Sequence, residues 1–147
     1  MTPMPDRGYW VCDYCLTFSF PHGSPDDVQD FGQATDRTCP ICTHPLTAGR
    51  LEGQPVEYCA NCHGMLMRQG VFSRVIEMKR SNYRGEKVTS RQPLNRQELQ
   101  REIRCPGCQN PFSTHPYYGP GRVVVDTCPH CCLIWLDAGE MSIIEKA

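Results

Sequence analysis

Eleven cysteines in a chain of 147 residues restrict the possible folds more than any other feature of the sequence. Ten of them form five pairs with two residues between the partners: Cys12/Cys15, Cys39/Cys42, Cys59/Cys62, Cys105/Cys108 and Cys128/Cys131. This spacing lets a tight turn direct both sulfur atoms to one point, and two such turns supply the four thiolates of a tetrahedral zinc site. The chain is therefore expected to fold around metal ions or disulfides.

The remaining composition favours small modules that need such a staple. Hydrophobic residues make up 39% of the chain, the mean hydropathy is −0.47, and 13 prolines and 12 glycines interrupt the sequence. The opening residues MTPMPDRGYW lack the apolar region of a signal peptide, and no stretch approaches the roughly 18 apolar residues of a membrane helix. We therefore expect a cytoplasmic protein without a membrane segment, whose thiols bind metal rather than form disulfides.

The intervals between the pairs indicate which cysteines share a site. Successive pairs are separated by 23, 16, 42 and 19 residues, and only 16 and 19 lie in the usual range of a zinc ribbon. This predicts two zinc sites with the ligands Cys39, Cys42, Cys59 and Cys62, and Cys105, Cys108, Cys128 and Cys131. An alternative pairs Cys12/Cys15 with Cys39/Cys42 and leaves Cys59/Cys62 without partners.

An internal repeat supports the first grouping. TCPICTHPL (38–46) aligns with RCPGCQNPF (104–112), and YCANCHGMLMRQGVFSRVIE (58–77) aligns with TCPHCCLIWLDAGEMSIIEK (127–146). The offset is 66 residues before the hairpin and 69 after it, so the second copy has three extra residues, which we place around YYGPGR before a strand formed by VVVD. The chain then divides into an N-terminal segment (1–37), ribbon 1 (38–77), a linker (78–103) and ribbon 2 (104–147).

The residues after the last cysteine pair have the pattern of a helix start. Asp137 and Glu140 have the spacing of a capping box, and Leu136 and Met141 have that of a hydrophobic staple. A short helix should follow to the end of the chain. In the first copy Arg68 stands where the cap would be, so its helix start should be weaker by about 1 kcal/mol.

The pattern CPxC, a hairpin and then CPxCxxxWLDxGE resembles the bacterial zinc-ribbon family that is named for its likeness to the ribbon of transcription factor IIB. The second copy resembles it closely over 104–146 and the first more loosely over 38–77. The resemblance implies a zinc-ribbon fold with four cysteine ligands in each copy and says little about activity. The second copy departs from the family in having Cys132 and Leu133 where two small glycines usually follow the last ligand. The predicted fold is thus a small, metal-stapled α+β structure: tandem zinc ribbons, each a β-hairpin with a short capped helix, after an N-terminal knuckle-like segment.

The N-terminal cysteine pair has no obvious partner pair. Apolar residues alternate in YWVCDYCLTFSF (9–20), which predicts a strand or hairpin around it. A third metal site would combine Cys12 and Cys15 with His22 and one more ligand, for which Cys132 is a candidate. The duller interpretation is a vestigial or reducible dithiol, with Cys132 as a small buried hydrophobe.

Charge is segregated along the chain. Residues 1–38 carry two basic and six acidic side chains, whereas residues 77–104 carry eight basic and four acidic ones. The second half of the basic stretch has its own helix-start pattern, with Asn95 as the cap and Glu98 three residues later. The stretch is either a solvated connector or a phosphate-binding element. The candidate contacts for nucleic acid are Arg80, Arg84, Lys87 and Arg91.

Three functions are compatible with these patterns. The first is a non-enzymatic zinc-binding adaptor for a protein partner, with two or three zinc ions. The second is a nucleic-acid-binding or transcription-associated module, against which stands a pI near 6.5 for the whole chain. The third is a thiol redox protein, which needs an open cysteine pair, whereas four-cysteine sets leave no position open. We favour the adaptor.

Overall fold

The computed structural model describes residues 2–4, 9–11, 18–19, 28–83, 85, 99–117 and 123–146. For the first three strands and for Asp30, Ser142 and Lys146 it describes the backbone alone. The three N-terminal strands, β1 (Thr2–Met4), β2 (Tyr9–Val11) and β3 (Phe18–Ser19), form a small antiparallel sheet in sequence order. Strands were predicted in this region, whereas Cys12, Cys15 and His22 lie outside the described residues.

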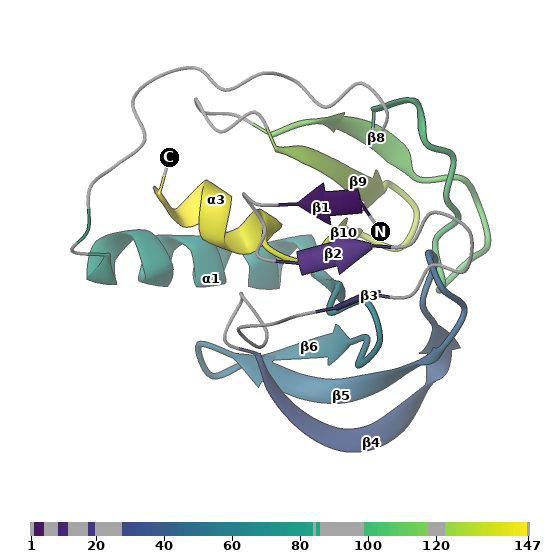
Figure 1. Ribbon diagram of the computed structural model, residues 1–147, viewed down its shortest axis with the longest axis horizontal. Coiled ribbons are helices and arrows are strands. Elements are labelled where there is room, and N and C mark those ends of the chain that lie inside the picture. The colour runs from purple at the N-terminus through teal and green to yellow at the C-terminus, as the bar shows by residue number, and fades with distance from the viewer. Residues whose placement is uncertain are drawn as a thin grey trace.

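The two repeats share a single seven-stranded antiparallel sheet (Figure 1). Its strand order is β4 (Gln29–Thr38), β5 (Pro45–Leu51), β6 (Gln54–Tyr58), β7 (Met65–Arg68), β10 (Leu133–Leu136), β9 (Val124–Cys128) and β8 (Ser113–Pro116). The first four strands come from the first half of the chain and the last three from the second. The predicted antiparallel hairpins are present, and the VVVD stretch lies at the start of β9.

The repeats meet where β7 pairs with β10. Leu66 lies opposite Trp135, and Met65 lies opposite Leu136. Because the repeat offset is 69 residues here, Leu66 and Trp135 are counterparts, so the two copies are related by a pseudo-two-fold axis through this pair. The two ribbons therefore share one sheet built from two related halves rather than forming two separate domains.

Alternation along the two central strands divides the core into two clusters. Met65, Met67, Ile134 and Leu136 face the helix-side cluster, which also holds apolar residues of both helices. Leu66 and Trp135 face the metal-side cluster, which contains cysteines of both predicted zinc sites. One face of the sheet centre thus supports the helices and the other supports the metal sites.

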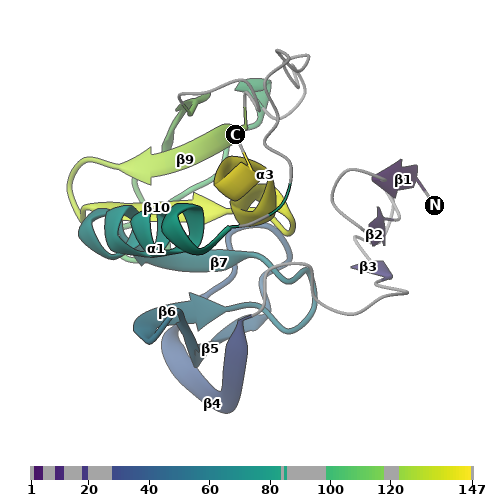
Figure 2. The same cartoon turned by 90° about the vertical axis from the view of Figure 1, so that its left-hand side faces the viewer.

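Each half continues from its central strand into a helix, and the two helices lie side by side (Figures 1 and 2). Helix α1 (Gln69–Asn82) buries Phe72, Val75 and Ile76, whose spacing places them on one side of a helix. Helix α3 (Glu140–Lys146) is half as long and buries Met141 and Ile144. The staple residues Leu136 and Met141 both belong to the helix-side cluster. As predicted, the start of α1 lacks a side-chain cap: Arg68 occupies the N-cap position, and its side chain makes no capping hydrogen bond.

A buried lysine joins three parts of the fold. Lys79 of α1 is 6% exposed, and its ammonium nitrogen lies 3.5 Å from a carboxylate oxygen of Glu52 and 3.9 Å from one of Glu145. Glu52 lies in the turn between β5 and β6, and Glu145 lies in α3. A buried charge of this kind is tolerated because it is paired. The ion pairs hold the tip of the first hairpin and both helices together.

The linker is shorter than the range 78–103, because α1 continues to Asn82 within it. Near its other end, Leu99 and Gln100 are helical, while Asn95 and Glu98, the predicted start of that helix, lie outside the described residues. Strand β4 likewise extends the first half back to Gln29, inside the predicted N-terminal segment. None of the described helices has the length and hydropathy required to cross a bilayer.

Candidate metal centres

The first four-cysteine group joins two turns of the sheet. Cys39 and Cys42 lie between β4 and β5, and Cys59 and Cys62 lie between β6 and β7. Sulfur–sulfur distances are 3.7 Å for Cys39–Cys62 and 3.4 Å for Cys42–Cys59. Four sulfurs around zinc at about 2.3 Å would lie about 3.8 Å apart, so the arrangement fits a tetrahedral ion closely.

The second group repeats this construction. Cys105 and Cys108 lie in a turn closed by an antiparallel bridge between Arg104 and Pro111, which is the counterpart of the Thr38–Pro45 pair in the first copy. Cys128 is the last residue of β9 and Cys131 lies between β9 and β10, and the sulfurs of Cys108 and Cys128 are 3.5 Å apart. In both groups all four sulfurs lie within 4.8 Å of one another. The structure thus selects the repeat-based pairing and rules out the alternative that joined Cys12/Cys15 to Cys39/Cys42.

All four cysteine turns have the same backbone. The carbonyl of each first cysteine accepts a hydrogen bond of 2.8–3.1 Å from the residue after the second cysteine. A backbone amide within each turn also donates to the first cysteine's sulfur at 3.4–3.5 Å. The residue after the second cysteine has a positive φ in every turn: Thr43 (61°), His63 (59°), Gln109 (63°) and Cys132 (56°). The turn therefore orients and stabilises the thiolates without needing glycine at this position.

Cys132 shows how the second site accommodates its departure from the family pattern. Its left-handed backbone costs about 1 kcal/mol or more for a residue with a Cβ. In return its amide donates to Cys128 O at 2.9 Å, and its carbonyl accepts from the amide of Gln69 at 2.8 Å. The side chain is exposed rather than buried, and it belongs to neither four-sulfur group among the described residues. Cys132 is therefore a turn residue of the second site. The third metal site predicted from Cys12, Cys15, His22 and Cys132 stays a prediction.

The clustered thiols already favour partial ionisation. Hydrogen bonding from Cys39, followed by Cys59 and Cys62, holds the pKa of Cys42 well below its usual range. The pKa of Cys59 is lowered to about 7, chiefly by its hydrogen bond with Cys39, whereas that of Cys62 is raised by the thiols of Cys39, Cys42 and Cys59. In the second group a backbone hydrogen bond from Asn110 leads the lowering of the Cys108 pKa to about 7. A metal ion that displaces the remaining protons would complete each set.

Beside the second site lies a buried polar network centred on Asp137. One oxygen of this carboxylate accepts from the indole Nε1 of Trp135 at 3.1 Å, and the other accepts from Arg101 at 2.7 Å. Arg101 also donates to Asp126 at 3.1 Å, and Asp126 in turn accepts from the hydroxyl of Thr114 at 2.7 Å. The network ties the linker end to β8, β9 and β10.

Burial controls the charges in this network. Asp126 is fully buried, and desolvation raises its pKa to about 6 even though Thr114 and Arg101 oppose the shift. Burial works to lower the pKa of Arg101, but the charge and hydrogen bonds of Asp137, with the charge of Asp126, raise it further above its ordinary value. Arg101 therefore stays charged and neutralises carboxylates that would otherwise be costly to bury.

The network adds ionic partners to the predicted capping role of Asp137. One hydrogen bond of the predicted capping box is present, because Glu140 Oε2 accepts from the backbone amide of Asp137 at 2.9 Å. The Asp137 carboxylate, however, is engaged with Trp135 and Arg101. Sequence reasoning missed Arg101 and Asp126 as partners. Asp126 had a usable signal, since it is a carboxylate at the end of an apolar strand directly before the last cysteine pair.

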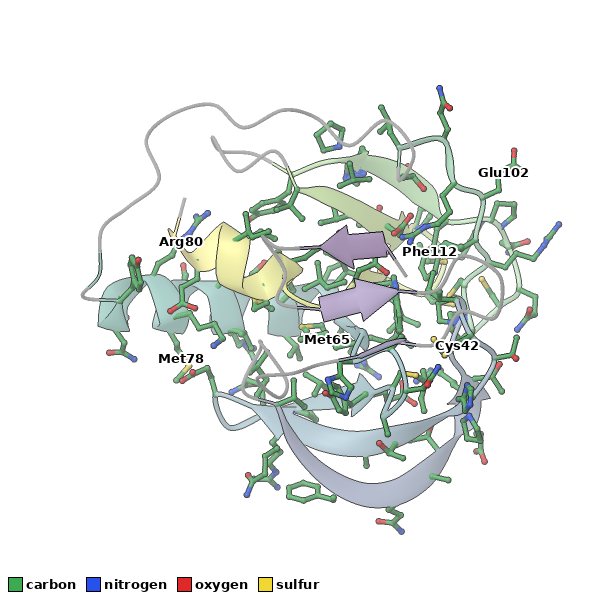
Figure 3. All side chains as sticks on the ribbon, in the orientation of Figure 1. Cys42, Met65, Met78, Arg80, Glu102 and Phe112 are labelled. Carbon is green, nitrogen blue, oxygen red and sulfur yellow. The ribbon has the colours of Figure 1, made fainter. Side chains whose placement is uncertain are left out.

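The predicted nucleic-acid residues are only partly within the described chain. Arg80 is held against α3, where its Nε and one terminal nitrogen donate to the carbonyl of Ile144 at 3.4 and 3.2 Å. Figure 3 shows Arg80 at the end of the molecule opposite to Cys42 and Phe112. Arg84, Lys87 and Arg91 lie outside the described residues. Arg80 thus has a structural partner, which the sequence did not indicate.

Two four-cysteine clusters on one antiparallel sheet, each followed by a helix, define a tandem zinc-ribbon protein whose ligand sets are consistent with two zinc ions. The family model described as "Transcription factor zinc-finger" matches residues 38–78 and 104–147, which is more than half of the chain, and the protein belongs to this zinc-ribbon family. Comparison with curated proteins and with solved structures gave no significant match.

Proposed function

We propose that this protein is a non-enzymatic adaptor in which two zinc ions stabilise a rigid sheet that binds another protein. The ligand sets support this role for the metals, because each predicted site has four thiols and a catalytic zinc site keeps one position for water or substrate. The described cysteine pairs are also all engaged in the two clusters, which leaves thiol redox chemistry to Cys12/Cys15, outside the described residues.

Phe31 is the observation that carries the proposal. Its side chain is 53% exposed, whereas Phe72, Phe112 and Trp135 are buried. Aromatic side chains supply much of the binding energy of protein interfaces, because they bury a large rigid surface. A half-exposed phenylalanine on a small protein therefore favours a partner with an apolar pocket.

The strand that presents Phe31 supports the same interpretation. β4 is the outermost strand of the large sheet and has β5 as its neighbour there (Figure 1). Its pairing is irregular, since Asp30 pairs with Gly49 and Ala34 pairs with Thr47, so two extra residues bulge from β4. Bulges redirect side chains and weaken edge-to-edge strand pairing, so a side-chain anchor is favoured over strand addition. The acidic residues of 1–38 favour a partner with a basic rim around its pocket.

Nucleic-acid binding is the second candidate, favoured by the net positive charge of residues 77–104 and by the family's description. The engagement of Arg80 with Ile144 reduces the basic surface available for phosphates. Zinc held by four thiolates adds negative charge to both sites. These features favour the adaptor role over nucleic-acid binding through a broad phosphate-binding surface.

A photo-crosslinking amino acid at position 31 would test the adaptor. Met78 offers a matched control, because it is the other exposed large hydrophobic residue of the described chain, at 39%, and lies on α1. We expect a discrete protein adduct from position 31 that survives nuclease, with little from position 78. Added in excess as a competitor for the partner, the Phe31→Ala protein without the crosslinker should fail to suppress the adduct. Equal labelling from both positions would contradict the proposal.

A salt titration would test the alternative. Replacing Arg84, Lys87 and Arg91 with Gln leaves the Arg80–Ile144 contact intact. If the stretch binds phosphates, sub-micromolar binding of nucleic acid should persist near about 0.15 M salt, and the triple variant should lower the salt slope by about one unit per lost contact. The adaptor proposal expects weak binding that disappears at this salt concentration.

A further inference from the structure

The contact between Trp135 and Gly64 crosses from one half of the molecule to the other. Gly64 lies two residues after Cys62, the last ligand of the first site, whereas Trp135 belongs to the second ribbon. A Cβ built on Gly64 would lie 2.7 Å from Cη2 of the indole and closer still to Cζ2. The indole therefore occupies the space that any other residue at position 64 would need.

Gly64 is part of the turn that forms the first site. Its carbonyl accepts the hydrogen bond from the amide of Cys59 at 3.0 Å, which closes the turn around Cys59 and Cys62. A displacement of Gly64 would therefore move the backbone that carries two of the four ligands. The fully buried Trp135 belongs to the same metal-side cluster as Cys39, Cys59 and Cys62.

The orientation of the indole is set by the second half. Its Nε1 donates to Asp137, and Arg101 holds Asp137 at 2.7 Å. A continuous chain of contacts thus runs from the linker end through Asp137 and Trp135 to the turn of the first zinc site.

A reciprocal contact reaches the second site. The amide of Gln69, the first residue of α1, donates to the carbonyl of Cys132 at 2.8 Å, and its side-chain amide donates to the carbonyl of Leu133 at 3.5 Å. Cys132 directly follows the ligand Cys131 and forms the left-handed corner of that turn. One turn of each zinc site is therefore braced by the opposite half of the molecule.

We propose that Trp135 is a positioning residue of the first zinc site. Its contact with Gly64, together with the contact of Gln69 at the second site, makes the two sites one coupled metal-binding unit. Zinc bound at either site stabilises the turn, the central β7–β10 pairing and, through them, the ligands of the other site. The inference concerns metal affinity and is independent of the adaptor role.

Gly64→Ala tests the brace in the full chain. Gly70→Ala is the matched control, because a Cβ at Gly70 has no heavy atom within 4 Å. Affinity would be measured by cobalt titration, followed through thiolate-to-cobalt absorption, and each site's occupancy by mapping which cysteines resist alkylation. We expect Gly64→Ala to weaken the first site about tenfold or more, as substitutions around metal ligands do, with a smaller loss at the second. Gly70→Ala should match the wild type.

Two further variants keep the test decisive if Gly64→Ala does not fold. Trp135→Phe removes the outer part of the indole without adding bulk, and it should weaken the first site more than the second. Cys59→Ser with Cys62→Ser disables the first site, and it should lower the cobalt affinity of the second about tenfold. A second site with wild-type affinity in the double variant, or equal weakening of both sites by Trp135→Phe, would overturn the proposal.

Discussion

The two ribbons of this protein reach stability by different routes. Ribbon 1 has longer regular elements, with seven residues in β5 and 14 in α1, and the start of α1 has no side-chain cap. Ribbon 2 has a four-residue outer strand and a seven-residue helix, but it contains the buried network around Asp137. The copy with less regular structure therefore relies more on polar contacts, which suits a module too small to bury much apolar surface.

Equivalent carboxylates illustrate the difference. Glu57 and Asp126 are counterparts at the repeat offset of 69, and each pairs with an arginine that precedes the first cysteine turn. In ribbon 1 the partner, Arg37, is 41% exposed, whereas in ribbon 2 Asp126 is fully buried against Arg101. The equivalent carboxylates thus form a partly exposed ion pair in one half and a more deeply buried one in the other. A motif that repeats in sequence thus need not repeat in energetic importance.

Metal removal should produce the largest effect on both ribbons. Structural zinc contributes on the order of 10 kcal/mol to small modules, so a chelator should unfold the sheet under reducing conditions. Elemental analysis should first give two zinc ions per chain, or three if the N-terminal pair also binds. Less than about one per chain would contradict the assignment of these sites.

The order of release would sharpen the comparison. Cys108 and Cys131 of the second site are half-buried, whereas Cys42 is the half-buried ligand of the first. We expect the second site to exchange metal faster, because reagents reach its thiols more easily. Alkylation during slow chelation, mapped by mass spectrometry, should label the ligands Cys108 and Cys131 before those of the first site, with the exposed Cys132 left out of the comparison. Earlier labelling of Cys59 and Cys62 would reverse the comparison.

The cysteine grouping could be predicted because it depends on local information. Two-residue spacing produces a turn wherever it occurs, and the repeat offset pairs the turns without reference to the rest of the fold. The VVVD strand, the staple of Leu136 with Met141, and the missing cap at Arg68 are local in the same sense. These features depend on residues within a few positions of one another.

The joining of the two ribbons is a long-range property that no local pattern specifies. The apolar runs around Leu66 and Trp135 indicate buried strands but do not identify each other as partners. The sequence places Arg101 in a basic linker that is either solvated or phosphate-binding, because its partners, Asp126 and Asp137, are 25 and 36 residues away. The sequence predicts only a helix cap at Asp137 for the same reason. Its capping partner Glu140 is near in sequence, whereas its ionic partner Arg101 is not.

Alanine at two equivalent positions tests the polar network. Asp137→Ala should destabilise the protein by about 3 kcal/mol, because it removes the acceptor of the buried indole Nε1 and leaves Arg101 with Asp126 as its remaining carboxylate partner. Arg68, its counterpart in ribbon 1, is exposed, so Arg68→Ala should change stability by less than about 0.5 kcal/mol. Denaturant unfolding of the zinc-loaded proteins would measure both.

A conservative variant separates charge from hydrogen bonding. Asp137→Asn keeps an acceptor for Trp135 but removes the charge that pairs with Arg101, so its loss of stability should be intermediate. If Asp137→Ala loses only about 1 kcal/mol, the residue acts as an ordinary cap and the two ribbons are more alike than their contacts indicate.

The smallest effect concerns the uncapped helix of ribbon 1. Arg68 has φ −70° and ψ 146°, the extended conformation that an N-cap residue needs, and its side chain is exposed. Arg68→Ser should let the hydroxyl accept from an amide of the first turn of α1 and stabilise the protein by about 1 kcal/mol. Serine is preferred to aspartate because Arg68 pairs with Leu133, two residues from the ligand Cys131, where serine adds no further negative charge. Arg68→Ala is the control, since it removes the same arginine without supplying an acceptor. Equal stability of the Ser and Ala variants would mean that α1 is already fixed by the hydrogen bond from Gln69 to Cys132 and by the pairing of β7 with β10. In that case the second ribbon, rather than a cap, determines where the first ribbon's helix begins.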